Sequence, residues 1–251
     1  MQAGIDTIFF DVGATLRVVV ADREFSKAAE DEIMRLVQSP ESPEAFFAKL
    51  ESNWKAFRKR AKTMMLDVSE MELWIQHLLP DYPQDVLADN AAALTRLWRN
   101  HDGRRVPRPD VTDTVRTLCR RGYKLGIIAN TITETEIPDW MCAEKIAGCF
   151  HTVILSSKVR LRKPDPAIYH LAARCIGSKP ETCAYVGDNP VRDVEGTVAS
   201  GFGAMILLDV PDASDKDKAA PCPPDRTITQ ISDLLDLFAN RSGQNRKETS
   251  W

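Results

Sequence analysis

The sequence predicts an α/β protein with a doubly wound parallel sheet and a helical unit inserted after the first strand. The first observation is that short apolar runs, rich in β-branched and aromatic residues, alternate along the chain with segments of helical periodicity. Repeated strand–helix units imply parallel strands with helices on both faces of the sheet. The second observation is that about ninety residues after Leu16 read only as helices, which exceeds any normal connection between two strands.

The sheet is expected to begin near the N-terminus. Residues 5–10 form an apolar run too short for a helix, which predicts a buried strand that delivers Asp11 to its carboxyl end. In open α/β sheets ligands bind at that edge. Further strands are expected to end at Asn130 and to cover residues 151–155, 183–187 and 204–208, with a last strand–helix unit over residues 227–238.

The inserted unit is expected to contain helices from about residue 22 to residue 98. The first follows from apolar positions at helical spacing up to about residue 37. Ser42 and Pro43 are typical of a helix start, and the pattern after them extends through Phe57. Ser69 and Glu72 predict a capping box ahead of the third helix, and the fourth covers residues 84–98.

Strand–helix alternation resumes near residue 106. Asp110 is expected to cap a helix that runs to Arg121 and stops at Gly122. Three more helices are expected: residues 136–147, residues 165–175 and a helix after Pro190.

The bulk composition is that of an ordinary globular protein. The chain has 251 residues, of which 43% are hydrophobic and 27% charged, and its net charge of −3 predicts no general attraction to nucleic acid or an anionic membrane. Without a membrane-spanning run or an N-terminal signal pattern, a cytoplasmic protein is expected. The four histidines lack the spacing of zinc ligands. Free thiols are expected for all six cysteines, which are Cys119, Cys142, Cys149, Cys175, Cys183 and Cys222.

Polar residues follow several of the predicted strands, in a fixed order. Asp11 follows the first strand, and Asn130 and Thr131 end the second. Lys163 lies in a Lys-Pro-Asp-Pro segment, and residues 187–193 read Gly-Asp-Asn-Pro-Val-Arg-Asp. In this order and spacing the set resembles the four motifs of the haloacid dehalogenase superfamily of phosphatases and related hydrolases.

The resemblance implies a domain organisation. Residues 1–16 and 105–240 would form the Rossmann-like hydrolase core, and residues 17–104 would form a C1-type helical cap over the catalytic edge. Residues 241–251 are expected to be a disordered tail because the segment is polar.

The resemblance also implies roles for individual residues. Asp11 would attack phosphorus and form an aspartyl-phosphate, since a carboxylate is ionised at neutral pH and needs no activating base. Lys163 would neutralise the nucleophile and the phosphoryl oxygens as a compact charge. The remaining implied residues are the Mg²⁺ ligands Asp11, Gly13 (through its carbonyl), Asp188 and Asp193, a further catalytic and substrate-binding residue, Asn130, and the substrate-binding residues Thr15, Thr131 and Lys163.

Two positions depart from the phosphatase pattern. The general acid expected two residues after the nucleophile is replaced by Gly13, and the hydroxyl residue expected at the second strand end is replaced by Ala129. General acid–base catalysis contributes roughly 10²–10⁴ in rate, and a glycine cannot provide it. Asn130 or Thr131 would have to replace the missing hydroxyl.

Three functions remain open at this point. The first is Mg²⁺-dependent hydrolysis of a small phosphorylated metabolite by a monomer or homodimer, slow or dependent on good leaving groups. The second is carbon–phosphorus cleavage, as in phosphonoacetaldehyde hydrolase, in which a cap lysine forms an imine. The third is a silent binding protein. The retained acidic pair argues against carbon–halogen cleavage, whose enzymes use no Mg²⁺. The candidate cap lysines are Lys49, Lys55, Lys59 and Lys62.

Overall fold

The computed structural model describes residues 4–211, 213 and 219–241, and its centre is a six-stranded parallel sheet. The expected disordered tail lies outside the described residues except for Arg241. In spatial order the strands are β5 (Phe150–Leu155), β4 (Lys124–Ala129), β1 (Thr7–Phe10), β6 (Cys183–Gly187), β7 (Ala204–Leu208) and β8 (Arg226–Ile228).

Strand β1 is in the middle of the sheet. Its last residue, Phe10, is opposite Ile127 of β4 on one side and Val186 of β6 on the other. The chain builds outward from β1 to β5 and then returns to place β6 against β1. The carboxyl ends of β1 and β6 therefore flank the point where the strand order reverses, which is where ligands bind in such sheets.

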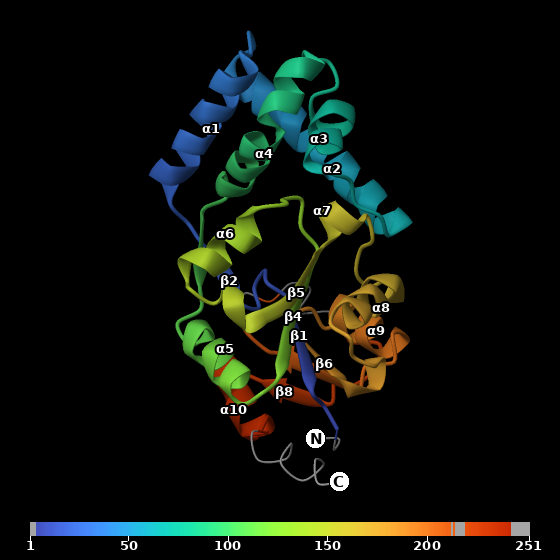
Figure 1. Ribbon diagram of the computed structural model, residues 1–251. Helices are drawn as coiled ribbons and strands as arrows, with labels where there is room; N and C mark the ends of the chain where they lie inside the picture. Colours follow the sequence, from blue (N-terminus) through green and yellow to red (C-terminus); the bar gives the residue numbers. More distant parts are fainter. Residues whose placement is uncertain (1–3, 212, 214–218, 242–251) are drawn as a thin grey trace.

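Helices cover both faces of the sheet (Figure 1). Successive residues of β1 point to opposite faces, so Ile8 and Phe10 pack with the α5 side and Phe9 packs with the α8 side. Each face therefore has its own apolar core. The helices of this part are α5 (Val111–Arg120), α6 (Glu136–Ala143), α7 (Ser156–Val159), α8 (Pro166–Cys175), α9 (Arg192–Ala199) and α10 (Leu234–Leu237).

A separate helical unit lies above the sheet, at the end opposite to the N-terminus (Figure 1). It has an apolar core of its own around Phe46, Leu50 and Trp74, and the indole N–H of Trp74 donates to Thr95 Oγ1 at 2.8 Å. Its helices are α1 (Arg23–Val37), α2 (Pro43–Met64), α3 (Glu70–Glu72) with a following π-helical segment (Leu73–Leu78), and α4 (Gln84–Asn100).

The expectation that no strand follows Leu16 is wrong. Strand β2 (Arg17–Val20) pairs in an antiparallel manner with β3 (Arg104–Pro107), so the segments that enter and leave the helical unit form a small ribbon. The run Arg-Val-Val-Val is β-branched, and the side chains of Val19 and Val20 are about half exposed. A run of this length shows no alternation of apolar and polar residues, so the sequence does not indicate a strand here.

Two further expectations need correction. The Asp110 side chain does not cap α5, because its carboxylate accepts the backbone N–H of Ser232 at 2.7 Å. Helix α6 ends at Ala143 rather than at residue 147, and Lys145 has a positive φ of 56°, which is incompatible with a continuing helix.

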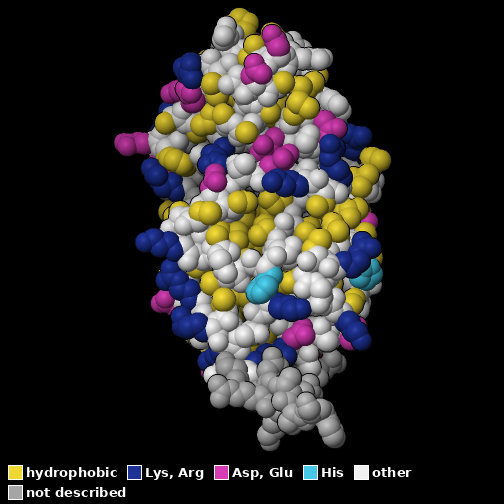
Figure 2. All heavy atoms as spheres, in the orientation of Figure 1, with side chains coloured by type: hydrophobic (Ala, Val, Ile, Leu, Met, Phe, Trp, Pro, Cys, Tyr) yellow, Lys and Arg dark blue, Asp and Glu magenta, His cyan; other side chains and the backbone are white. Residues whose placement is uncertain are grey.

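The surface and the thiols agree with the composition. Lys and Arg side chains are spread over the face in Figure 2 together with Asp and Glu. Among the described residues no helix is both long and apolar enough to span a bilayer. All six cysteines are free, as predicted.

Candidate active site

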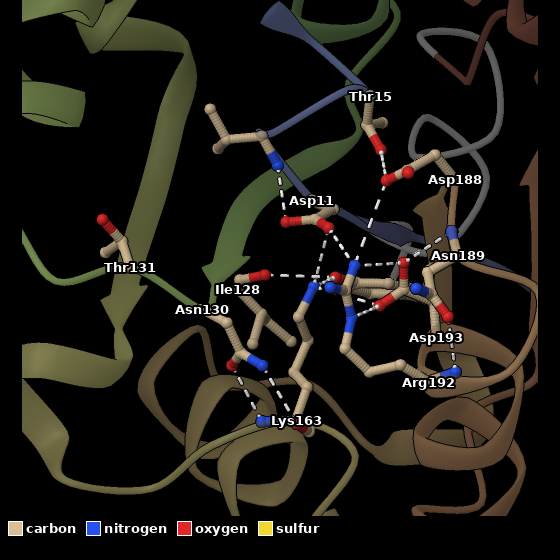
Figure 3. A network of polar contacts seen from close by, with 12 residues as sticks. Asp11, Thr15, Ile128, Asn130, Thr131, Lys163, Asp188, Asn189, Arg192 and Asp193 are labelled. Carbon is tan, nitrogen blue, oxygen red and sulfur yellow. Dashed lines mark hydrogen bonds and ion pairs between the residues drawn. The ribbon is translucent and has the colours of Figure 1, made fainter. Parts of the chain in front are cut away.

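Three carboxylates meet at the carboxyl edge of the sheet (Figure 3). Asp11 follows β1, Asp188 follows β6, and Asp193 lies in the first turn of α9. All three are buried, and one oxygen from each lies within 4.8 Å of the others. Parallel packing of β1 against β6 produces this proximity, because it places two strand ends side by side.

Lys163 reaches these carboxylates from the loop after α7. Its Nζ lies 3.1 Å from Asp11 Oδ2 and 3.1 Å from Asp193 Oδ1, and the residue is 1% exposed. The Asn130 side chain holds the backbone of this residue, since its amide donates to Lys163 O and its carbonyl accepts from Lys163 N, both at 2.9 Å. Asn130 thus orients the lysine, and it also lines the cavity in front of Asp11.

Arg192 is the fifth member of the group and was not singled out from the sequence. Its Nη2 lies 2.6 Å from Asp11 Oδ2, and its Nε lies 2.8 Å from Asp193 Oδ1. Nη2 is also 2.9 Å from Asp193 Oδ2 and 4.0 Å from Asp188 Oδ1. A basic residue directly before Asp193 and four residues after Asp188 was the available signal. We call Asp11, Asp188, Asp193, Lys163 and Arg192 the acidic cluster.

The opposite charges of Asp193 and its basic neighbours keep Asp193 and Arg192 ionised. Burial alone would raise the pKa of Asp193, but Arg192 and Lys163 outweigh it and lower that pKa to about 2. Burial would lower the pKa of Arg192, and Asp193 and Asp11 reverse this and raise it well above its usual value. Asp193 is therefore ionised, and Arg192 positively charged, at neutral pH.

The remaining predicted residues lie at different distances from the cluster. The Thr15 hydroxyl donates to Asp188 Oδ1 at 3.0 Å, so it holds a carboxylate. The Thr131 hydroxyl is turned away from the cluster (Figure 3) and lies 3.3 Å from that of Thr133. A Cβ on Gly187 would lie 2.4 Å from Asp193 Oδ2, so only glycine permits this carboxylate to approach β6.

A cavity of about 440 Å³ opens in front of Asp11 and is called the site cavity here. Asp11, Gly13 and Arg192 line it, together with Arg58 of α2 and Arg105 of β3. A Cβ added to Gly13 would meet no atom within 4 Å. A ligand in this cavity would contact both the acidic cluster and the helical unit.

A second charged group borders the same cavity and connects the helical unit to the core. The Glu136 carboxylate, at the start of α6, pairs with Arg17 of β2 and Arg99 of α4, and Arg105 Nε lies 4.0 Å away. Arg105 Nη2 also pairs with Asp102 at 3.0 Å. We call Arg17, Arg99, Arg105, Asp102 and Glu136 the arginine cluster.

The pKa values reflect the excess of arginines. Burial would raise the pKa of Glu136, but Arg99 and Arg17 lower it to about 2. Burial and the nearby Arg99 lower the pKa of Arg105 to about 10. Glu136 and Arg105 therefore stay charged at neutral pH.

The lysines of the helical unit lie at different places relative to the site. Lys49 pairs with Glu41 and with Asp81 within the unit. Lys62 lines a cavity of about 270 Å³, called the side cavity, that also borders Lys163 and Arg192. Of the four candidates, Lys62 is thus the one that lines a cavity shared with the acidic cluster.

Comparison with known proteins identifies the relatives of this chain. A family model described as haloacid dehalogenase-like hydrolase matches residues 5–201. A glyceraldehyde 3-phosphate phosphatase of Methanopyrus kandleri is 31% identical over 138 residues, 52% of this chain and 56% of that protein. Haloacetate dehalogenase H-2 of a Moraxella species is 35% identical over 133 residues, 53% of this chain and 57% of that protein.

The fold is similar over a longer stretch than the sequence. A 2-haloacid dehalogenase of Pseudomonas syringae pv. Tomato superposes with a TM-score of 0.68 at 20% identity, and the match covers 93% of this chain and 97% of that one. At this identity the likeness shows a shared fold. The chain spans little more than half the length of each of these two curated relatives.

Proposed function

Because the chain belongs to the haloacid dehalogenase-like hydrolase family, we propose that it hydrolyses a phosphate ester through an aspartyl-phosphate at Asp11. One Asp11 carboxylate oxygen attacks phosphorus, the phosphorus–oxygen bond of the ester breaks, and the alcohol oxygen departs with the electron pair. Water then attacks the acyl phosphate, releases inorganic phosphate and restores the carboxylate. The helical unit acts as the cap of this site.

The observation that carries the proposal is the surroundings of Asp11. A carboxylate can approach an anionic phosphoryl group only where positive charge compensates it. Lys163 Nζ lies 3.1 Å from Asp11 Oδ2, and Asp11 lines the site cavity. The similarity to a glyceraldehyde 3-phosphate phosphatase supports the same type of reaction.

The oxygen donors also suit a divalent cation. Asp11, Asp188 and Asp193 present their oxygens within 4.8 Å of one another, and Mg²⁺ binds such oxygen ligands. These carboxylates, with the Gly13 carbonyl, would hold the ion. Mg²⁺ bound there supplies charge neutralisation for the nucleophile and the phosphoryl group.

The site cavity favours a substrate with a second anionic group beyond its phosphate. Arg58 projects from α2, its guanidinium carbon lies 5.6 Å from the centre of the Trp54 ring, and no carboxylate in the described part of the chain pairs with it. Arg105 lines the same cavity. A carboxylate or second phosphate of the substrate would give Arg58 the anionic partner that the protein does not supply.

The first experiment measures turnover with Mg²⁺ across phosphate esters and acyl phosphates of graded leaving-group pKa. Activity should fall steeply as the leaving group becomes more basic, because Gly13 provides no general acid. Asp11→Asn should abolish turnover, while Asp89→Asn, an exposed position in α4, should not change it. Full turnover by Asp11→Asn would contradict the nucleophile assignment, and turnover of haloacids alone would favour carbon–halogen cleavage.

A gain of activity provides the sharper test. The open space around Gly13 admits a side chain without a clash, so Gly13→Asp is expected to fold normally. If the site lacks only its acid, this variant should speed hydrolysis of esters with basic leaving groups by about 10²-fold and flatten the leaving-group dependence. An unchanged rate with unchanged stability would contradict the proposed phosphate position.

A further inference from the structure

We propose that Arg192 is a resident cation of the acidic cluster, and that a divalent metal ion binds only when it displaces the guanidinium from the three carboxylates. The inference rests on the proposed function, which identifies these carboxylates as a metal site, and it names how that site is regulated. Its tests measure metal binding and side-chain position, so they can succeed or fail independently of any turnover.

The first step is that Arg192 uses the oxygens that a metal would need. Asp11 Oδ2 accepts from Arg192 Nη2 at 2.6 Å, and Asp11 Oδ1 is taken by the backbone N–H of Val12 at 2.7 Å. Both oxygens of Asp193 also accept from Arg192, at 2.8 and 2.9 Å. The guanidinium therefore lies on the Asp11 and Asp193 oxygens that a metal ion would need.

The second step is that the two cations exclude each other. Mg²⁺ binds carboxylate oxygens at about 2.0–2.1 Å, so an ion on Asp11 Oδ2 would lie against the guanidinium nitrogen that contacts the same atom. Like charges at this separation repel strongly in a buried site. Lys163 touches the same two carboxylates, but its Nζ is fully buried and its backbone is fixed by Asn130, so the arginine is the group that moves.

The third step is that the structure provides space for the displaced side chain. The side chain of Arg192 is 25% exposed and lines both the site cavity and the side cavity. Glu195, exposed and three residues further along α9, lines the side cavity as well. A guanidinium that leaves the cluster can pair with this carboxylate, since residues three apart on a helix are neighbours.

A Mn²⁺ titration, followed by the electron paramagnetic resonance of the free ion, tests the proposal on the full chain. Arg192→Gln should bind Mn²⁺ at least about tenfold more tightly than the natural protein, because one competing positive charge is gone. Arg192→Lys keeps the charge and should remain within about threefold of the natural protein. Arg162→Gln is the matched control, because Arg162 lines the side cavity but pairs with Asp67 outside the cluster.

The outcomes separate the possible causes. Equal affinity in the natural protein and Arg192→Gln would overturn the proposal. Equal tightening by Arg162→Gln would also overturn it, because the effect would then come from net charge alone. Failure of every phosphate ester to turn over would reject the proposed function but leave this binding comparison intact.

A measurement on the unaltered chain covers the case in which Arg192→Gln does not fold. The side-chain Nε–H resonance of Arg192, assigned by its absence from Arg192→Lys, should shift in proportion to bound Mg²⁺ as the bond to Asp193 is lost. Saturation with Mg²⁺ without any shift of this resonance would contradict the displacement.

Discussion

The two charged clusters that border the site cavity are built in opposite ways. The acidic cluster has three carboxylates against two basic side chains, an excess of one negative charge. The arginine cluster has three arginines against two carboxylates, an excess of one positive charge. The acidic cluster can therefore accept a further cation, and the arginine cluster attracts an anion.

The two clusters also differ in the elements that supply their residues. The acidic cluster draws its carboxylates from two strand ends and one helix start, all at the switch point of the sheet. The arginine cluster draws on β2, β3, α4 and α6, and it fixes the stem of the helical unit, which is the β2–β3 ribbon, to the core. Removing a charge from the arginine cluster should therefore reduce stability more than removing one from the acidic cluster, where the change should also alter cation binding.

The largest stability effect is expected for Glu136→Gln. Arg99 and Arg17 lower the pKa of Glu136 from an ordinary value of 4.5 to about 2, which corresponds to stabilisation on the order of 3 kcal/mol at neutral pH. The variant leaves three arginines with Asp102 alone. Urea unfolding at neutral pH should show the loss, and Glu195→Gln, an exposed control, should stay within about 0.5 kcal/mol. A loss below 1 kcal/mol would show that this cluster does not stabilise the stem.

Asp193→Asn is the matched change in the acidic cluster and should cost less. Arg192 and Lys163 lower its pKa from an ordinary value of 3.8 to about 2, which is a smaller decrease than that of Glu136, so a smaller loss of stability is expected. The variant also makes the acidic cluster neutral, whereas Glu136→Gln doubles the excess charge of the arginine cluster. The same unfolding assay compares the two. A larger loss of stability for Asp193→Asn than for Glu136→Gln would contradict the expectation that the arginine cluster stabilises the fold more than the acidic cluster does.

Glu136 of the arginine cluster should contribute more to the pH dependence of stability than Asp193 of the acidic cluster. Both carboxylates have lowered pKa values, so their stabilisation is complete above their ordinary values of 4.5 and 3.8. It is lost progressively as the pH falls from those values to about 2. Unfolding midpoints measured from about pH 5 down to pH 3 should therefore decrease, and less steeply in Glu136→Gln than in Asp193→Asn. Parallel curves for the two variants would contradict the unequal contributions.

The residues of the acidic cluster show how much of the site could be predicted from the sequence. β6 and β7 lie where predicted because each is a short apolar run. Parallel strands then place Asp11 and Asp188 together without further information. Arg192 could not be assigned this way, because the phase of α9 relative to the sheet decides whether its side chain faces the carboxylates or solvent.

The contacts within the arginine cluster could not be predicted from the sequence, for a different reason. Arg17, Arg99, Arg105 and Glu136 come from four separate elements and share no spacing that a motif could record. Their meeting depends on the β2–β3 ribbon, which the sequence analysis did not predict. Buried ion pairs between distant segments depend on tertiary packing, whereas strand ends in one sheet follow from local pattern and topology.

The smallest expected effect concerns Arg58, a basic residue that lines the site cavity. Arg58→Ala should raise KM about tenfold for a phosphate ester that carries a second anionic group, because one charge-assisted contact is lost. Hydrolysis of an ester without such a group should change far less. Arg60→Ala is the matched control, since it removes a positive charge two residues away whose guanidinium contacts His77 rather than the site cavity. An equal rise of KM for both esters in Arg58→Ala would show that Arg58 contacts the phosphoryl group itself. Arg58 would then not select for a second anionic group on the substrate.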